Sequence, residues 1–144
     1  MAGSSETRTG DVSRVGDTWA VRAFLKLDAL ASGVLGVVLA ALSVVLEQPL
    51  GLPVGLLVPA GLFLVAFAAG LWYLSGREAV RRAAVSEVIL INVLWVVASV
   101  VVVIAGWFSP TDLGTVFILL QAAAVGGFAA LQYAAVRRTG SAVR

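Results

Sequence analysis

The chain of 144 residues contains no cysteine and no histidine, and only 12% of its residues are charged. The absence of cysteine excludes disulfides and thiolate metal sites. The absence of histidine removes the commonest general base and the commonest metal ligand of proteins. The sequence also lacks the phosphate-binding, dinucleotide-binding, HExxH and GxSxG motifs of familiar enzymes. We therefore expect a protein without catalytic activity, without a cofactor and without a metal site.

Apolar residues dominate what is present. They make up 60% of the chain, and its mean hydropathy is +1.02. An ordinary soluble domain has about a quarter of its residues charged. A soluble core of this size leaves roughly a third of its chain surface in water, so it has no room for this much apolar surface. The net charge is only +2 and the basic residues are scattered, so we expect a lipid bilayer rather than nucleic acid as the partner.

Four long apolar runs predict an all-α membrane protein, a four-transmembrane-helix bundle formed by residues 19–138. Each run has about 20 residues or more, which as a helix crosses a hydrocarbon core of about 30 Å. Short links make consecutive helices antiparallel neighbours. We expect residues 1–18 and 139–144 to be flexible cytoplasmic tails. The predicted spans are about 27–46, 53–74, 84–107 and 113–136.

The basic residues predict the orientation of the spans. All ten lie before the first span, between the second and the third, or after the fourth: Arg8, Arg14, Arg22, Lys26, Arg77, Arg81, Arg82, Arg137, Arg138 and Arg144. The two opposite links contain only Glu47 and Asp112 as charged residues. The positive-inside rule therefore predicts a plasma-membrane (inner-membrane) protein with both termini in the cytoplasm.

A weak internal similarity suggests a duplicated helical hairpin. A shift of 59 residues places Asp28 over Glu87 and Gly55 over Gly114. Two such hairpins would be parallel repeats about an axis along the membrane normal. The alternative is chance similarity between segments rich in alanine, valine, leucine and glycine.

Five polar residues inside the spans are the candidates for an ion or ligand site: Asp28, Glu87, Asn92, Gln121 and Gln132. We expect Asp28, Glu87 and Gln132 near the cytoplasmic boundary, where a carboxylate costs less than at mid-bilayer. In one interpretation they form a polar cluster at the inner mouth of the bundle that holds a proton or a cation. In the other, each acid pairs with a neighbouring lysine or arginine, or caps its helix.

The amides of Asn92 and Gln121 are expected deeper in the membrane, where a side-chain amide needs a hydrogen-bond partner. One interpretation is that both amides hydrogen-bond across helices and hold them together. The other is that they line a path for a ligand or an ion. Trp95, in the middle of its span, is interpreted as a packing residue.

Small residues recur at intervals of four in the first two spans, and such faces let helix backbones approach closely. Spacing does not tell whether these faces pack inside one bundle or between protomers. The residues predicted to pack helices together are Ser32, Gly36 and Ala40 in the first span, Ala66 and Gly70 in the second, and Ser99, which shares a face with Asn92.

Several short segments resemble small four-transmembrane-helix integral membrane proteins of bacteria, of an actinobacterial type. The resemblance covers about residues 19–138; it implies the four-span topology and assigns no activity, cofactor or site. The segments that carry it are Lys26–Ala29 with Ser32 and Gly33, Leu50–Pro53, Asn92–Val96 and Leu119–Ala122.

These observations favour a non-catalytic assembly or partner-binding membrane subunit, whose partner is a second copy of the chain or another membrane protein. One alternative is a small oligomeric transporter or channel in which Asp28 and Glu87 take part in moving a proton or cation. The other is a protein that binds a lipid or a hydrophobic ligand between its helices.

Overall fold

The structure, a computed structural model, describes residues 19–141, with side chains described as far as Arg138. Within this range it is all-helical and contains no strand. Its four long helices are apolar and long enough to cross a membrane, which confirms the predicted fold class of a multi-pass membrane bundle. The helices are α1 (Trp19–Ala41), α2 (Ser43–Leu50), α3 (Val54–Ser75), α4 (Arg82–Ala105) and α5 (Asp112–Ser141).

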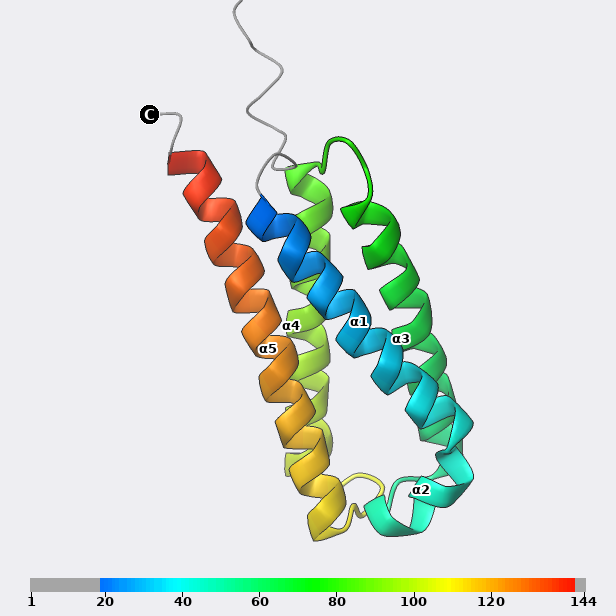
Figure 1. Ribbon diagram of the computed structural model, residues 1–144. Coiled ribbons are helices and arrows are strands. Elements are labelled where there is room, and N and C mark those ends of the chain that lie inside the picture. Colours follow the sequence, from blue (N-terminus) through cyan, green and yellow to red (C-terminus); the bar gives the residue numbers. More distant parts are fainter. Residues whose placement is uncertain (1–18, 142–144) are drawn as a thin grey trace, which may run out of the picture.

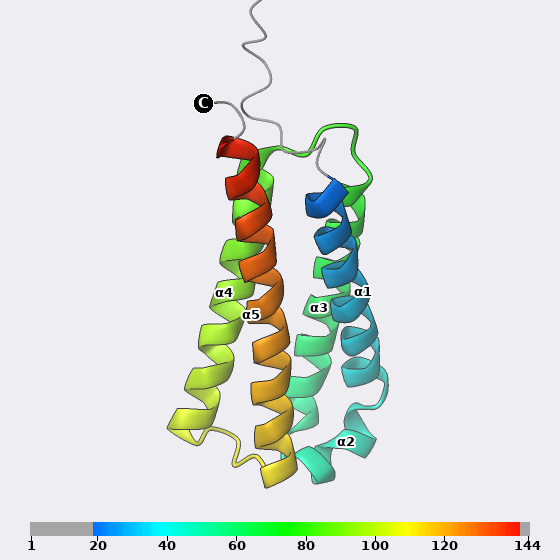
Figure 2. The ribbon, with the colours of Figure 1, turned by 60° about the vertical axis from the view of Figure 1, so that its left-hand side comes forward.

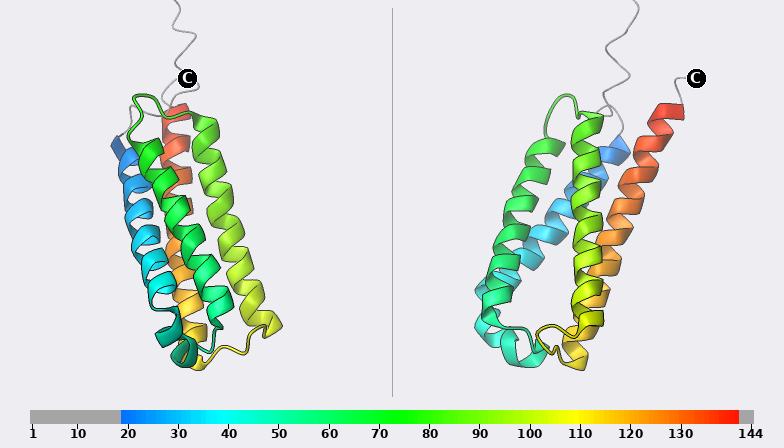
Figure 3. Two further views of the ribbon diagram at one scale, coloured as in Figure 1. Left: turned by 90° about the vertical axis from the view of Figure 1, so that its right-hand side faces the viewer. Right: turned by 180° about the vertical axis from the view of Figure 1, so that it is seen from behind.

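The four long helices form two antiparallel pairs. α1 packs along α3, α4 packs along α5, and the contact between α1 and α5 joins the pairs (Figures 1 and 2). The consecutive helices α3 and α4 are antiparallel neighbours as predicted, but their backbones lie further apart than those within the two pairs, and side chains such as Phe63 and Trp95 make their contact. The link of residues 76–81 allows this, because six extended residues span up to about 20 Å. From this link, α3 and α4 diverge toward the end that carries α2 (Figure 3).

The first span differs from its predicted position of 27–46. α1 begins eight residues earlier, at Trp19, because Val21 and Leu25 give this segment a fully buried apolar face. The helix ends at Ala41, and the chain then forms the short helix α2, which takes up the last four residues of the predicted span and the first four of the predicted link. As a consequence, Asp28 lies about 14 Å from the start of α1 at the usual helical rise, well inside the helix rather than at its boundary.

The other three spans begin and end within about two residues of their predicted limits, apart from the last end. α5 continues to Ser141, so residues 139–141 of the predicted tail are helical. The remaining predicted tails, 1–18 and 142–144, lie outside the described residues.

α1 and α3 cross at two glycines. A Cβ on Gly36 would lie 2.7 Å from the carbonyl oxygen of Gly61, and a Cβ on Gly61 would lie 2.6 Å from the backbone nitrogen of Ala40. Neither position has room for a side chain, so the backbones meet directly. Ser32 and Gly36 are buried and Ala40 is half-buried, so the small-residue face predicted for the first span packs inside this bundle.

The small-residue face predicted for α3 lies on the outside of the bundle and is not used inside it, so its packing between protomers stays a prediction. Ala66 and Gly70 are exposed, and nothing lies within 4 Å of the position that a Cβ on Gly70 would occupy. α3 instead packs through Gly61, Leu64 and Ala68. Both faces of this helix are apolar and carry small residues, and in lipid an exposed face is as apolar as a buried one, so residue type does not distinguish them.

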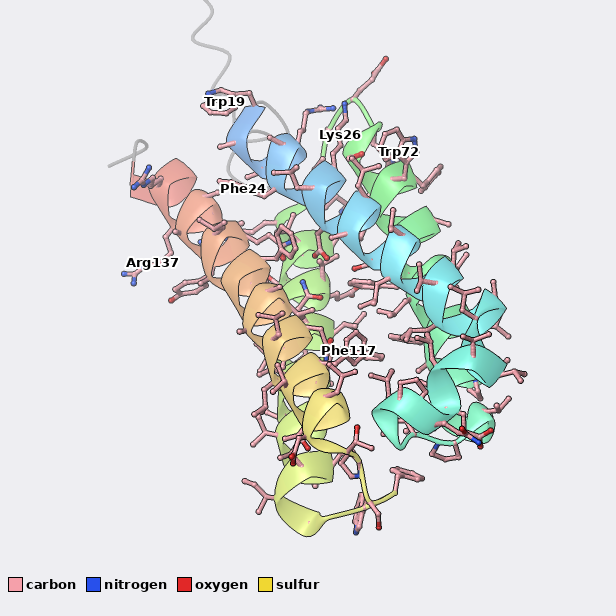
Figure 4. All side chains as sticks on the ribbon, turned by 60° about the horizontal axis from the view of Figure 1, so that its bottom comes forward. Trp19, Phe24, Lys26, Trp72, Phe117 and Arg137 are labelled. Carbon is pink, nitrogen blue, oxygen red and sulfur yellow. The ribbon has the colours of Figure 1, made fainter. Side chains whose placement is uncertain are left out.

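Polar contacts tie the helices together at both ends of the bundle. At the end with the start of α1 and the α3–α4 link, Arg22 donates hydrogen bonds to the carbonyl oxygens of Ser75 and Glu78, at 3.1 and 2.8 Å. At the same end, Lys26 lies over the ring of Trp72, 6.0 Å from its centroid (Figure 4). At the opposite end, the Thr111 hydroxyl donates to the Pro49 carbonyl oxygen at 2.6 Å. The hydroxyl also accepts from the backbone nitrogen of Gly114, which caps the start of α5.

Candidate functional site

A buried polar cluster joins α1, α4 and α5. The Oδ2 atom of Asp28 accepts hydrogen bonds from Nδ2 of Asn92 and Nε2 of Gln132, both at 2.8 Å. Its Oδ1 atom accepts one from the Ser32 hydroxyl at 3.1 Å. Nδ2 of Asn92 also lies 3.3 Å from Oε1 of Gln132. Asp28 and Gln132 are fully buried, so three of the four long helices meet at one carboxyl group.

Hydrogen bonds are the reason that this cluster is stable inside an apolar bundle. A buried polar group without a partner costs about 1–3 kcal/mol, and a carboxylate costs more. No buried side-chain nitrogen or oxygen within the described part of the chain lacks a hydrogen-bond partner. The acceptor and donor groups of the Asp28 cluster satisfy one another, which is the behaviour expected of polar side chains that hold helices together.

Glu87 is not part of this cluster. Its side chain is exposed on α4, and within residues 19–141 it makes no hydrogen bond or ion pair. The predicted cluster of Asp28, Glu87 and Gln132 therefore forms without Glu87, and Asn92 joins it instead. The alternative expectation for Asp28, a pair with a neighbouring basic residue, is wrong, because two amides and a hydroxyl supply its hydrogen bonds.

A second polar group lies between α4 and α5 and consists of Trp95, Ser99 and Gln121. The indole nitrogen of Trp95 donates to Oε1 of Gln121 at 2.7 Å. Nε2 of Gln121 donates to the Ser99 hydroxyl and to the carbonyl oxygen of Ile118, both at 3.0 Å. The Ser99 hydroxyl donates to the Trp95 carbonyl oxygen at 2.8 Å. The orientation of the amide follows from chemistry, because an indole N–H only donates and must face Oε1.

This second group forms one wall of an apolar cavity of about 200 Å³ between the two helix pairs. Phe117 extends from α5 into the space between α5 and the α1–α3 pair (Figure 4). The walls come from all four long helices and from Leu52, which precedes α3. The lining residues are Leu35, Leu52, Leu56, Leu57, Ala60, Trp95, Ala98, Ser99, Val102, Phe117, Ile118 and Gln121.

An aromatic contact lies beside the cavity, where Trp95 is one of the lining residues. The ring of Phe63 on α3 stacks on the ring of Trp95 on α4, with centroids 5.7 Å apart and an interplanar angle of 5°. The two rings bridge α3 and α4 at a level where their backbones stay apart. Toward α2 the two helices diverge (Figure 3). Lining residues such as Leu52, Leu56 and Phe117 place the cavity toward this end.

The structure thus divides the predicted site residues among three places. Asp28, Asn92 and Gln132 come together in one cluster, Gln121 lies in the cavity wall, and Glu87 lies on the outer surface. The prediction missed the role of Trp95. The signal was available, because an indole N–H in the middle of a span needs an acceptor, and the amide of Gln121 is such an acceptor on the next helix.

Comparisons with known proteins add no assignment: no family model, no curated protein and no solved structure matches the chain. The resemblance to small bacterial four-span proteins therefore stays a prediction.

Proposed function

We propose that this membrane protein binds a hydrophobic ligand, in the class of lipids and other hydrocarbon-chain molecules, in the cavity between its two helix pairs. The observation that carries the proposal is the cavity itself. Its lining is apolar apart from Ser99, Gln121 and the indole nitrogen of Trp95, which is the usual composition of a small-molecule pocket.

The cavity's apolar lining supports an apolar ligand rather than water. An apolar cavity of about 150 Å³ stays dry and accommodates benzene. The present cavity, at about 200 Å³, accepts a short length of hydrocarbon but not a whole phospholipid. The remainder of a long ligand would lie in the bilayer, reached between the diverging helices α3 and α4. Binding in this manner requires no aqueous entrance.

The proposed role is binding without catalysis. The polar side chains that lie within the interior of the bundle are hydrogen-bonded to one another or to backbone, in the Asp28 cluster and in the cavity wall. A nucleophile or general base needs a proton acceptor or donor directed at a substrate. The two clusters serve instead to fix the positions of α1, α4 and α5 around the cavity.

Native mass spectrometry of protein released gently from membranes tests this proposal. We expect an apolar molecule to be retained by the wild type and to be lost in Ala60→Phe, which fills the cavity from α3. Ala66→Phe is the matched control, because Ala66 is an exposed alanine on the same helix outside the cavity. Wild-type protein without any retained molecule, or equal retention by both variants, would contradict the proposal.

A second candidate function is the assembly or partner-binding role, and the outer face of α4 favours it. α4 is the most apolar of the four spans and the least buried. Glu87 is exposed near its start without a partner within the described residues. A neighbouring transmembrane helix with a lysine or arginine at the same level would satisfy this acid. Photo-crosslinking from Leu90 on this face tests the role: a discrete protein adduct that Glu87→Gln abolishes supports it, and crosslinks to lipid alone contradict it.

The transport alternative receives no support from the geometry, because Asp28 and Glu87 do not share a site. We also retain as a proposal the plasma-membrane location with cytoplasmic termini. The distribution of basic residues supports it: the start of α1, the α3–α4 link and the end of α5 lie at one end of the bundle (Figure 1).

A further inference from the structure

Three polar side chains line the cavity: Trp95, Ser99 and Gln121. Each of their hydrogen-bond donors already has an acceptor within the protein. The single indole N–H of Trp95 is bound to Gln121. Both amide hydrogens of Gln121 are used, one on Ser99 and one on the Ile118 carbonyl oxygen. The Ser99 hydroxyl hydrogen is directed at the Trp95 carbonyl oxygen. A ligand in the cavity therefore meets no free N–H or O–H from these three side chains.

The same wall has acceptor capacity left. An amide oxygen and a hydroxyl oxygen each have two lone pairs. Oε1 of Gln121 accepts one hydrogen bond, from Trp95, and the Ser99 oxygen accepts one, from Gln121. One lone pair remains on each oxygen, and both residues line the cavity. Among the hydrogen-bonding side chains that line the cavity, these two oxygens are the acceptors with capacity left.

From this imbalance we infer that the cavity prefers a neutral long-chain alcohol, whose hydroxyl group donates to Gln121 Oε1 or to the Ser99 oxygen. This inference rests on the proposed ligand-binding function and adds the ligand's chemical class. A fatty-acid carboxylate only accepts hydrogen bonds and would face acceptor oxygens, so the cavity disfavours it. An ether or a plain hydrocarbon fits the apolar walls but leaves the acceptors unused.

Three ligands of equal chain length test the inference: 1-decanol, decyl methyl ether and decanoate. Binding of each to the purified full chain in lipid nanodiscs is measured by calorimetry, with empty nanodiscs subtracted. One additional hydrogen bond corresponds to a preference of about fivefold, so we expect 1-decanol to bind at least about fivefold more tightly than the ether. Decanoate is expected to bind most weakly.

Two serine variants locate the effect. Ser99→Ala removes one of the two acceptors and leaves an amide N–H of Gln121 without its acceptor. The ether oxygen can accept from this N–H, so we expect the preference for the alcohol over the ether to fall. Ser43→Ala is the control, because Ser43 is also a buried serine that donates to a backbone carbonyl oxygen, but it lies outside the cavity. The control is expected to keep the full preference.

The outcomes separate this inference from the proposed function. Equal binding of alcohol and ether, tightest binding of decanoate, or an unchanged preference in Ser99→Ala overturns the inference while ligand binding itself stands. If none of the three binds, or if Ala60→Phe binds them as the wild type does, the proposed function fails and the inference fails with it.

Discussion

The Oδ2 atom of Asp28 lies 2.8 Å from Nε2 of Gln132, although 104 residues separate them in the chain. Asn92 donates to the same oxygen from α4, so one carboxyl group connects the first, third and fourth spans. The α1–α3 pair and the α4–α5 pair are joined by this contact inside the bundle and by the Thr111 contacts at its α2 end. The width of the cavity between the pairs therefore depends on these two connections and on the stack of Phe63 on Trp95.

Replacement of Asp28 is expected to lower the free energy of unfolding, and by more when fewer hydrogen-bond acceptors remain for Asn92 and Gln132. Asp28→Ala leaves the amides of Asn92 and Gln132 without their main acceptor, at a cost of about 2 kcal/mol or more. Asp28→Asn keeps one oxygen for both amides and presents an NH₂ group to Ser32, so it is expected to cost only about 1 kcal/mol. Thermal unfolding in detergent measures both. Equal losses would contradict this account, because they would show that one remaining carbonyl oxygen does not replace the carboxyl group as an acceptor.

The glycine crossing of α1 and α3 predicts strong sensitivity to a single methyl group. Gly61→Ala places a Cβ 2.6 Å from backbone atoms of Gly36 and Ala40, which requires the helices to separate and is expected to cost about 1–3 kcal/mol. Gly70→Ala is the control on the same helix, where a Cβ meets open space. The unfolding temperature should fall strongly in Gly61→Ala and stay unchanged in Gly70→Ala. Equal behaviour would place the helix contact elsewhere.

Glu87→Gln is expected to leave the free energy of unfolding within about 0.5 kcal/mol of the wild type, because the side chain is exposed and unpaired within the described residues. Comparing the stability of Glu87→Gln with that of Asp28→Ala tests whether the two acids lie in separate places, as in this structure, or in one shared site. If both acids contributed to one cluster, the two variants would destabilise the protein similarly in the same unfolding assay.

The absence of cysteine makes the orientation directly measurable, because a single introduced thiol is the only one in the chain. Gln48→Cys lies in α2 and Gly76→Cys in the α3–α4 link, at opposite ends of the bundle (Figure 1). In intact cells we expect a membrane-impermeant maleimide to label Gln48→Cys and not Gly76→Cys. The reverse pattern would contradict the orientation deduced from the basic residues.

The sequence was sufficient to predict the four spans and to predict that the amide of Asn92 has a hydrogen-bond partner. Both predictions follow from the absence of water in the bilayer. It was not sufficient for the face on which each helix packs. Ala66 and Gly70 have the same spacing as a packing face, yet α3 uses Gly61 and Ala68. In a membrane, core and lipid-facing surfaces are both apolar, so periodicity does not separate them.

The site was harder to predict than the fold for a related reason. The sequence identified the polar residues. Which of them contact one another depends on which helices pack together. The prediction placed Asp28, Glu87 and Gln132 at one level, but only the packing of the helices brings Asn92 to Asp28 and leaves Glu87 outside. The cavity depends on α3 and α4 staying apart, which the short link between them did not suggest.

Quenching of Trp95 fluorescence by 1-bromodecane tests the central claim most directly, because Trp95 lines the cavity. Replacing Trp19, Trp72 and Trp107 by phenylalanine leaves Trp95 as the only tryptophan. We predict saturable quenching in this background and in its Ala66→Phe variant, and only a weak, linear background in its Ala60→Phe variant. Linear quenching of equal size in all three proteins would show that the hydrocarbon reaches Trp95 only from the bilayer, and that the cavity binds no ligand.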